Sequence, residues 1–134
     1  MSLPTISVVT PTLNRAHFLG EAIESVRTQN YPNVEFIIVD GMSSDGTMDL
    51  LAGYPDIQVI CEPDDGLYDA INKGIRAGKG DFIALLNSDD VFPPNLFHEL
   101  AGAFAEPKIE AVYGRAEIFL DDANMVTSDR FAAA

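Results

Sequence analysis

Two adjacent carboxylates follow an apolar run in residues 82–90 (FIALLNSDD). The five apolar residues do not alternate with polar ones, which predicts a strand buried on both faces, as in a parallel sheet packed between helices. Ligands bind such sheets beyond the carboxyl ends of the strands, so Asp89 and Asp90 are expected beside a ligand. Adjacent carboxylates repel each other, and a divalent cation would relieve that cost. Alone, the pattern fits a solvated loop whose acids cap the next helix better than it fits a metal site.

Polar residues follow two other apolar runs in the same way. The segment TPT (10–12) follows the run that starts at Ile6, and Asp40-Gly41 follows the run 34–39. Because the carboxyl ends of parallel strands lie along one edge of a sheet, these groups are expected to converge on the acids at 89 and 90. Each acid by itself is more often a helix cap or a solvated residue, and for Asp40 the cap and the binding site have equal weight.

Strands and helices alternate along the chain. Hydrophobic patterns predict strands at 6–10, 34–39, 57–61, 82–86 and 111–120, with 125–127 pairing back antiparallel on the last, and helices at 17–29, 47–52, 67–77 and 95–105. Pro11 should stop the first strand, while Leu67 and Ile75 should face the core from the third helix. The alternation predicts an α/β fold, a three-layer sandwich with a mainly parallel central sheet, formed as one domain over residues 1–134.

Charge and composition exclude several classes of protein. With 21 acids against 8 lysines and arginines the net charge is -13, which should repel nucleic acid and anionic membranes. An anionic ligand would need local cations, backbone N–H groups or a metal. Cys61 is the single cysteine, which excludes an internal disulfide, and it is expected to be a packed strand thiol. No signal peptide and no apolar run of roughly 18 residues is visible, so we expect a cytoplasmic protein without a membrane span.

Several common active-site motifs are missing. The chain has no dinucleotide fingerprint G-x-G-x-x-G, no P-loop and no G-x-S-x-G nucleophile motif. His17 and His98 fall in predicted helices, where both should be surface residues rather than zinc ligands. The remaining chemistry uses hard oxygen ligands. Carboxylates suit Mg2+ or Mn2+, which proteins commonly hold through one or two carboxylates together with substrate phosphates.

Four segments resemble the family 2 glycosyltransferases in both order and spacing. They are residues 7–15 (SVVTPTLNR), 36–47 (FIIVDGMSSDGT), 65–74 (DGLYDAINKG) and 86–90 (LNSDD). The resemblance extends from about Ile6 to Val126. It implies the GT-A fold, a Rossmann-like nucleotide-binding α/β sandwich. It also implies transfer of a sugar from a nucleoside diphosphate sugar to a saccharide or lipid-linked acceptor, with inversion at the anomeric carbon, as in polysaccharide biosynthesis.

The resemblance also implies roles for the first loops. Thr10, Pro11 and Thr12 resemble the loop that lines the nucleotide base and ribose. Asp40 resembles the acid that hydrogen-bonds the base, commonly uracil, so a UDP-linked donor is expected. Arg15 could approach the diphosphate, although a solvated residue at a helix start explains it equally well.

The acidic segment takes the place of the family's D-x-D motif. In Asn87-Ser88-Asp89, Asp89 would be the metal ligand, with the Mn2+ or Mg2+ bridging the diphosphate, and Asp90 would support it. Asn87 replaces the first acid of the motif and can bond a ribose hydroxyl without adding charge. Asp65 is expected to close toward the nucleotide, whereas Lys73 on the following helix is expected to face solvent.

No residue matches the family's catalytic base. Asp121, Asp122 and Asp129 are best read as solvated residues in or near a turn. The donor half is therefore present without an acceptor half, which predicts that the chain is the N-terminal part of a longer transferase. Apolar surface left exposed by the missing half could make the chain a homo-oligomer. Partners could hold it at the inner face of the membrane. A non-catalytic nucleotide-sugar-binding module is the alternative. A sugar nucleotidyltransferase is disfavoured because its glycine- and arginine-rich first loop is missing.

Overall fold

The computed structural model describes residues 3–119 and 125–129. The chain divides into two compact units, residues 1–98 and residues 99–134.

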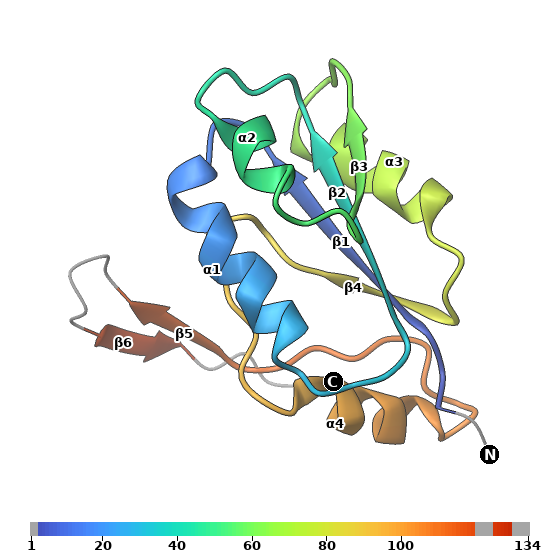
Figure 1. Ribbon diagram of the computed structural model, residues 1–134. Coiled ribbons are helices and arrows are strands. Elements are labelled where there is room, and N and C mark those ends of the chain that lie inside the picture. Colours follow the sequence, from blue (N-terminus) through green and yellow to red (C-terminus); the bar gives the residue numbers. More distant parts are fainter. Residues whose placement is uncertain (1–2, 120–124, 130–134) are drawn as a thin grey trace. The chain divides into compact units, whose positions relative to one another are not determined.

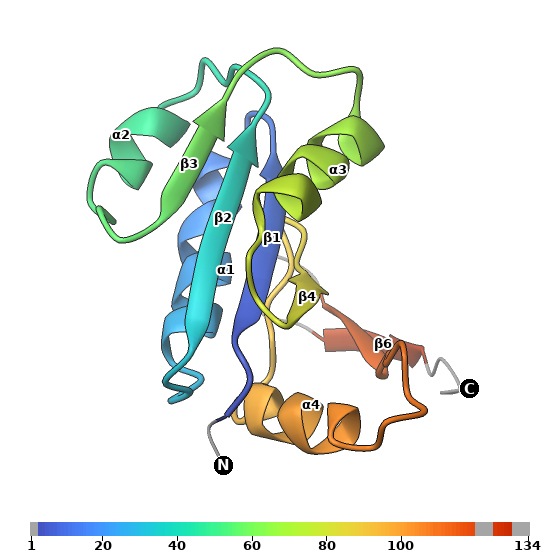
Figure 2. The same cartoon turned by 90° about the vertical axis from the view of Figure 1, so that its right-hand side faces the viewer.

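The first unit is built around a parallel sheet of four strands in the order β3-β2-β1-β4 (Figure 1). Its strands are β1 (Ile6–Thr12), β2 (Val34–Asp40), β3 (Gln58–Cys61) and β4 (Phe82–Leu85), and its helices are α1 (Ala16–Arg27), α2 (Thr47–Leu51) and α3 (Leu67–Ala77). Helices α1 and α2 cover one face of the sheet and α3 covers the other (Figure 2). The predicted three-layer α/β sandwich is therefore confirmed.

The two central strands are buried because both of their faces are covered. All seven residues of β1 are buried, as are the last five of β2. Helix α1 contributes the buried stripe that its sequence predicts, which consists of Leu19, Ala22, Ile23 and Val26. On the other face Gly74 lets α3 approach closely, because a Cβ atom there would lie 2.2 Å from the Cγ1 atom of Val9. The layers thus pack tightly beneath the loops that carry the polar residues.

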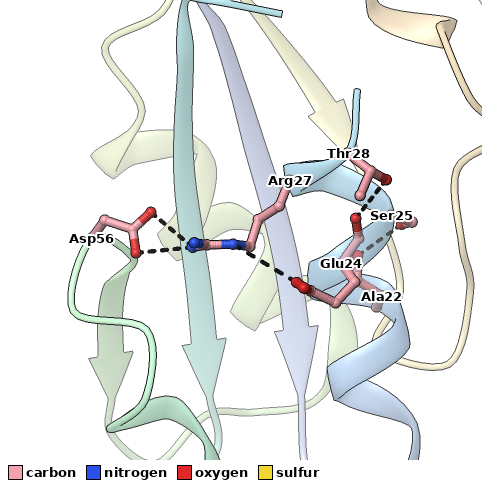
Figure 3. Close-up of polar contacts among 6 residues, drawn as sticks. All are labelled: Ala22, Glu24, Ser25, Arg27, Thr28 and Asp56. Carbon is pink, nitrogen blue, oxygen red and sulfur yellow. Dashed lines mark hydrogen bonds and ion pairs between the residues drawn. The ribbon is translucent and has the colours of Figure 1, made fainter. Parts of the chain in front are cut away.

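An exposed ion pair joins α1 to the segment that precedes β3. The guanidinium of Arg27 lies 3.1 Å from Asp56 and 3.7 Å from Glu24 (Figure 3). Exposed pairs of this kind contribute between about 0 and 1 kcal/mol, so the apolar layers rather than this contact hold α1 on the sheet.

The prediction that Pro11 ends the first strand is wrong, since β1 continues to Thr12. The Val9 carbonyl accepts a hydrogen bond from Leu86 on the β4 side, and the Thr12 carbonyl accepts one from Gly41 on the β2 side. Alternation places the backbone of Pro11 on the β4 side. Since β4 ends before it reaches Pro11, no ladder hydrogen bond is lost there.

Two burial predictions are also wrong. Strand β4 is not covered on both faces, since Phe82 and Ile83 are half-buried and Leu85 is 52% exposed. It is an edge strand that pairs with β1 alone among the described residues. On α3, Leu67 and Ile75 are exposed, because this helix contacts the sheet through small residues, Ala70 and Gly74.

The second unit contains an antiparallel hairpin of β5 (Ala116–Phe119) and β6 (Met125–Asp129). The antiparallel return is confirmed, but the strand predicted from residue 111 begins only at Ala116, while Leu120 and the predicted turn at 121–124 lie outside the described residues. Helix α4 (Leu96–Phe104) crosses the boundary between the units. No helix in the described part of the chain is long and apolar enough to span a membrane.

Candidate functional site

Polar residues from three strands meet at the carboxyl edge of the sheet, as the sequence predicts. The register pairs Thr12 with Asp40 and Asp40 with Cys61, so these three residues lie side by side on one face. The hydrogen bond from the Leu86 amide to the Val9 carbonyl, 3.0 Å long, brings the acidic segment alongside β1. The parallel topology is the physical cause of this convergence.

Asp40 is fully buried and closes the loop that follows β2. Its Oδ2 atom accepts hydrogen bonds from the amides of Met42 (3.1 Å) and Ser43 (2.9 Å), and its Oδ1 atom accepts one from the Ser43 hydroxyl at 2.5 Å. Four contacts with backbone and side-chain donors, including a long one from Cys61, keep this carboxylate in place. Among the described residues Oδ1 has only the Ser43 partner, which leaves acceptor capacity for a further donor.

Three residues that sequence reasoning missed join the loops after β1 and β2. The Asn14 amide donates to the Ser43 hydroxyl, and the Asn14 side-chain oxygen accepts from the Ser44 amide, both at 2.8 Å. The Asp45 carboxylate accepts from the Ala16 amide at 3.0 Å. A chain of hydrogen bonds therefore runs from Asn14 through the Ser43 hydroxyl to Asp40. All three residues lie inside the segments 7–15 and 36–47 that resemble the glycosyltransferase family, and this position was the only indication in the sequence that they belong to the site.

Two buried hydroxyls at the end of β1 have no hydrogen-bond partner among the described residues. They belong to Thr10, which is fully buried, and Thr12, which is nearly so. Both are paired in register with β2, Thr10 with Ile38 and Thr12 with Asp40, and they share one face of the sheet, whereas Pro11 belongs to the other. Unpaired buried polar groups are costly and rare, so we expect a ligand or a bound water to hydrogen-bond these hydroxyls at the edge of the sheet that also holds Asp40.

The acidic segment forms a turn in which the Asp90 amide donates to the Asn87 carbonyl at 3.1 Å. Ser88 is buried, whereas Asn87, Asp89 and Asp90 are exposed. Partial burial and the nearby charge of Asp89 raise the pKa of Asp90, against a hydrogen bond from Asn87 that lowers it. Helix α4 starts only at Leu96, so Asp90 does not cap it.

A divalent cation would fit this carboxylate pair only with additional ligands. No group of three or more histidine, cysteine or acidic side chains is placed to hold a metal within residues 3–119 and 125–129. Asp89 and Asp90 supply two hard oxygen donors whose charges already oppose each other. This donor set suits Mg2+ or Mn2+ that takes its other ligands from water and substrate phosphates.

The loop after β3 approaches the site through Asp64 rather than through the predicted Asp65. A Cβ atom on Gly41 would lie 2.6 Å from the Asp64 carboxylate, so only glycine fits at that point without moving it. Asp65 is exposed, and its amide donates to the Asp69 carboxylate at 2.9 Å. Asp64 and Asp65 could not be distinguished by sequence pattern, since their orientation depends on the loop at Gly66, which has a φ of 107° and whose amide donates to Asp64.

The prediction that Lys73 faces solvent is wrong. Its ammonium donates to the Pro63 carbonyl at 2.7 Å and lies 3.1 Å from Glu62 and 3.5 Å from Asp69. Partial burial would lower the pKa of Lys73, but these two carboxylates outweigh it and hold the pKa above its usual value. Lys73 therefore fastens the β3–α3 loop to α3.

Arg15 differs from Lys73 in its surroundings. It is exposed at the start of α1, and its guanidinium has no hydrogen bond or ion pair with any described residue. Of the two predicted cations, Arg15 is therefore the one whose charge is available to a ligand at this edge.

The prediction that Cys61 is a packed strand thiol is wrong, since Cys61 is exposed. It should nevertheless react slowly with alkylating reagents. Desolvation raises the pKa of its thiol, and so does Asp40, whose Oδ2 atom lies 3.5 Å from Sγ. A raised pKa means less thiolate at a given pH, so iodoacetamide at pH 8 should modify the folded chain several-fold more slowly than the urea-unfolded chain. The pH at which the alkylation rate reaches half of its maximum should also be higher for the folded chain than for the unfolded chain. Equal rates and equal pH midpoints in the two states would contradict this assignment.

Comparison with known proteins identifies relatives of the chain. The model of the family described as glycosyl transferase family 2 matches residues 7–132. TuaG of Bacillus subtilis, whose name assigns it to teichuronic acid biosynthesis, is 38% identical over 92 residues, covering 65% of this chain and 36% of TuaG. The chain thus spans about a third of the length of this curated relative.

Solved structures share the fold. The mannosyltransferase PcManGT from Pyrobaculum calidifontis, solved with GDP-Man and Mn2+, is 26% identical with a TM-score of 0.68 over 86% of this chain and 35% of its own. S. aureus TarS 1-349, solved with UDP-GlcNAc, has a TM-score of 0.66 at 24% identity over 77% of this chain and 31% of its own. The predicted GT-A fold is confirmed, and the chain belongs to glycosyl transferase family 2.

Proposed function

We propose that this chain is the donor-binding part of an inverting glycosyltransferase that moves a sugar from a nucleoside diphosphate sugar to an acceptor hydroxyl. One observation carries the proposal. The ends of β1 and β2 and the loop after β4 bring two hydroxyls without a described partner, a buried carboxylate and an acidic pair to one edge of the sheet. The related proteins solved with GDP-Man and UDP-GlcNAc support a nucleotide-sugar donor.

The end of β1 and β2 would hold the nucleoside, and we propose uridine. Uracil presents one ring N–H between two carbonyl oxygens, and Asp40 Oδ1 retains the capacity to accept that hydrogen bond, for which the loop over the buried Asp40 would have to move. The unpaired hydroxyls of Thr10 and Thr12 would gain partners from the base, the ribose or their bound water. Asp64, which packs against Gly41, would limit the space available beside the base.

The diphosphate would lie between the acidic pair and Arg15, whose guanidinium has no partner among the described residues. Asp89 would hold Mn2+ or Mg2+, with Asp90 supporting it and Asn87 near a ribose hydroxyl. The metal, when bound, offsets the charge that develops on the leaving diphosphate. Arg15 could add positive charge there, because no described acid neutralises it. Both contributions are needed to overcome the repulsion from a chain of net charge -13.

The acceptor hydroxyl would attack the anomeric carbon on the side opposite the leaving diphosphate, which inverts that carbon. A carboxylate would take the hydroxyl proton. We propose that this base and the binding site for a saccharide or lipid-linked acceptor belong to the remainder of a longer protein, since the chain spans about a third of TuaG. We also propose that the protein is cytoplasmic, that partners hold it at the membrane, and that it associates with itself.

Calorimetry with UDP, GDP and CMP in the presence and absence of Mn2+ tests the donor site. We expect one binding site with a dissociation constant between about 1 µM and 1 mM, tighter for UDP and dependent on Mn2+. Release of UDP from UDP-sugars, measured in parallel, separates a transferase from a binding module without turnover. Absence of nucleotide binding under all of these conditions would refute the proposal.

A further inference from the structure

Helix α1 is hydrogen-bonded to the segment that follows the acidic pair. The Phe92 amide donates to the Ser25 hydroxyl at 3.1 Å, although the two residues are 67 positions apart. The same hydroxyl donates to the Ala22 carbonyl at 2.7 Å, which fixes its orientation (Figure 3). Ser25 is half-buried, so this contact is partly shielded from water.

Gln29 makes a second connection between the same two segments. Its side chain is 1% exposed. The Nε2 atom donates to the Pro93 carbonyl at 2.8 Å and to the Ser25 carbonyl at 2.9 Å, while Oε1 accepts from the Phe97 amide at 3.1 Å. Every donor of this buried amide is used, and two of its three contacts reach the segment after the acidic pair.

The acidic turn is thereby held at both ends. Before it, the Leu86 amide is bonded to β1 through the Val9 carbonyl; after it, the Phe92 amide is bonded to α1. Only five residues, 87–91, lie between these two anchors. Within them Asp90 bonds back to Asn87, so little conformational freedom is left. Two carboxylates that repel each other would otherwise separate and would have to be reordered when a cation binds.

We propose that Ser25 and Gln29 are positioning residues that hold Asp89 and Asp90 in the arrangement that binds the metal–diphosphate. Neither residue touches the ligand; both act through the backbone of 92–97. The part of this inference that concerns metal affinity rests on the proposed function, whereas the clamping of the turn does not depend on it.

Ser25→Ala tests the clamp, with Thr28→Ala as the matched control. Both hydroxyls donate to a carbonyl of α1, Ser25 to Ala22 and Thr28 to Glu24 (Figure 3), but only Ser25 accepts from the segment after the acidic turn. Hydrogen–deuterium exchange of the Asp90 amide is measured without ligand, and Mn2+ with UDP is titrated by calorimetry. Ser25→Ala should accelerate the exchange about tenfold and weaken Mn2+–UDP binding about tenfold, while Thr28→Ala changes neither.

Ser25→Thr keeps the hydroxyl, so its Asp90 exchange rate and its Mn2+–UDP affinity should both equal those of wild type. This difference from Ser25→Ala would show that the hydroxyl, and not a general loss of stability, causes the effects. Ser25→Cys, with a weak acceptor in a similar volume, carries the same expectation as Ser25→Ala if the alanine variant does not fold. Unchanged exchange in Ser25→Ala, or faster exchange with unchanged affinity, would overturn the inference. If the wild type binds no nucleotide, the proposed function fails, and the exchange experiment still decides whether the turn is clamped.

Discussion

Asp40→Ala is expected to abolish UDP binding and to lower the free energy of unfolding by about 3 kcal/mol. The substitution removes the acceptor of the Met42 and Ser43 amides and of the Ser43 hydroxyl, in a position without solvent access. It also ends the hydrogen-bond chain from Asp40 through Ser43 to Asn14, so the loop after β1 loses one of its connections to the β2 side. Urea denaturation followed by circular dichroism measures the stability, and calorimetry measures the binding.

Asp40→Asn separates the two effects. The amide oxygen can still accept from the two backbone N–H groups, so we expect the stability cost to fall to about 1 kcal/mol. The amide nitrogen, however, would present a donor where uracil also presents one. Asp40→Asn should therefore fold and yet bind UDP at least about tenfold more weakly than wild type. If it binds UDP as tightly as wild type, Asp40 closes the loop and does not contact the base.

The elements that are fixed by local pattern could be predicted from the sequence. Helix α3 begins at Leu67 and ends at Ala77, as its pattern and the glycines around it indicate. The strand at Pro11 could not be predicted, because it depends on where β4 stops relative to β1. The exposure of Leu85 could not be predicted either, because it depends on β4 lying at the edge of the sheet. A missing N–H costs nothing where no partner strand lies opposite, and a sequence does not reveal the length of a neighbouring strand.

The site was predictable to the extent that topology determines it. Strands that run in parallel must end along one edge, so the convergence of Thr12, Asp40 and the acidic segment followed from the alternation of elements. The contributions of Asn14 and Asp64 did not follow, because they depend on loop backbones with positive φ values, 54° at Asn14 and 107° at Gly66. Such conformations determine which of several neighbouring polar residues turns toward the site.

Asp89→Ala should eliminate Mn2+-dependent binding of UDP, with a loss of about 100-fold or more. Asp89 is the acid that the resemblance assigns to the metal, and with Asn87 in place of the motif's first acid only Asp90 remains to replace it. Asp90→Asn is the matched comparison and should cost about tenfold, as expected for a supporting group. Calorimetry with EDTA gives the metal-independent part of binding, which neither substitution should change. Equal Mn2+–UDP affinity in Asp89→Ala and wild type would remove Asp89 from the metal site.

Although Asp89→Ala should lose Mn2+–UDP affinity, its thermal stability without ligand should not fall. Without a cation, desolvation and, to a smaller extent, the charge of Asp89 raise the pKa of Asp90, so the two carboxylates repel each other at neutral pH. Removal of Asp89 should lower the pKa of Asp90 and leave the melting temperature at pH 7 equal to or above that of wild type. Addition of Mn2+ and UDP should raise the melting temperature of wild type alone. A variant that is more stable than wild type but no longer responds to Mn2+ would identify the acidic pair as a site that is strained without its cation, whereas a variant that melts below wild type would contradict this.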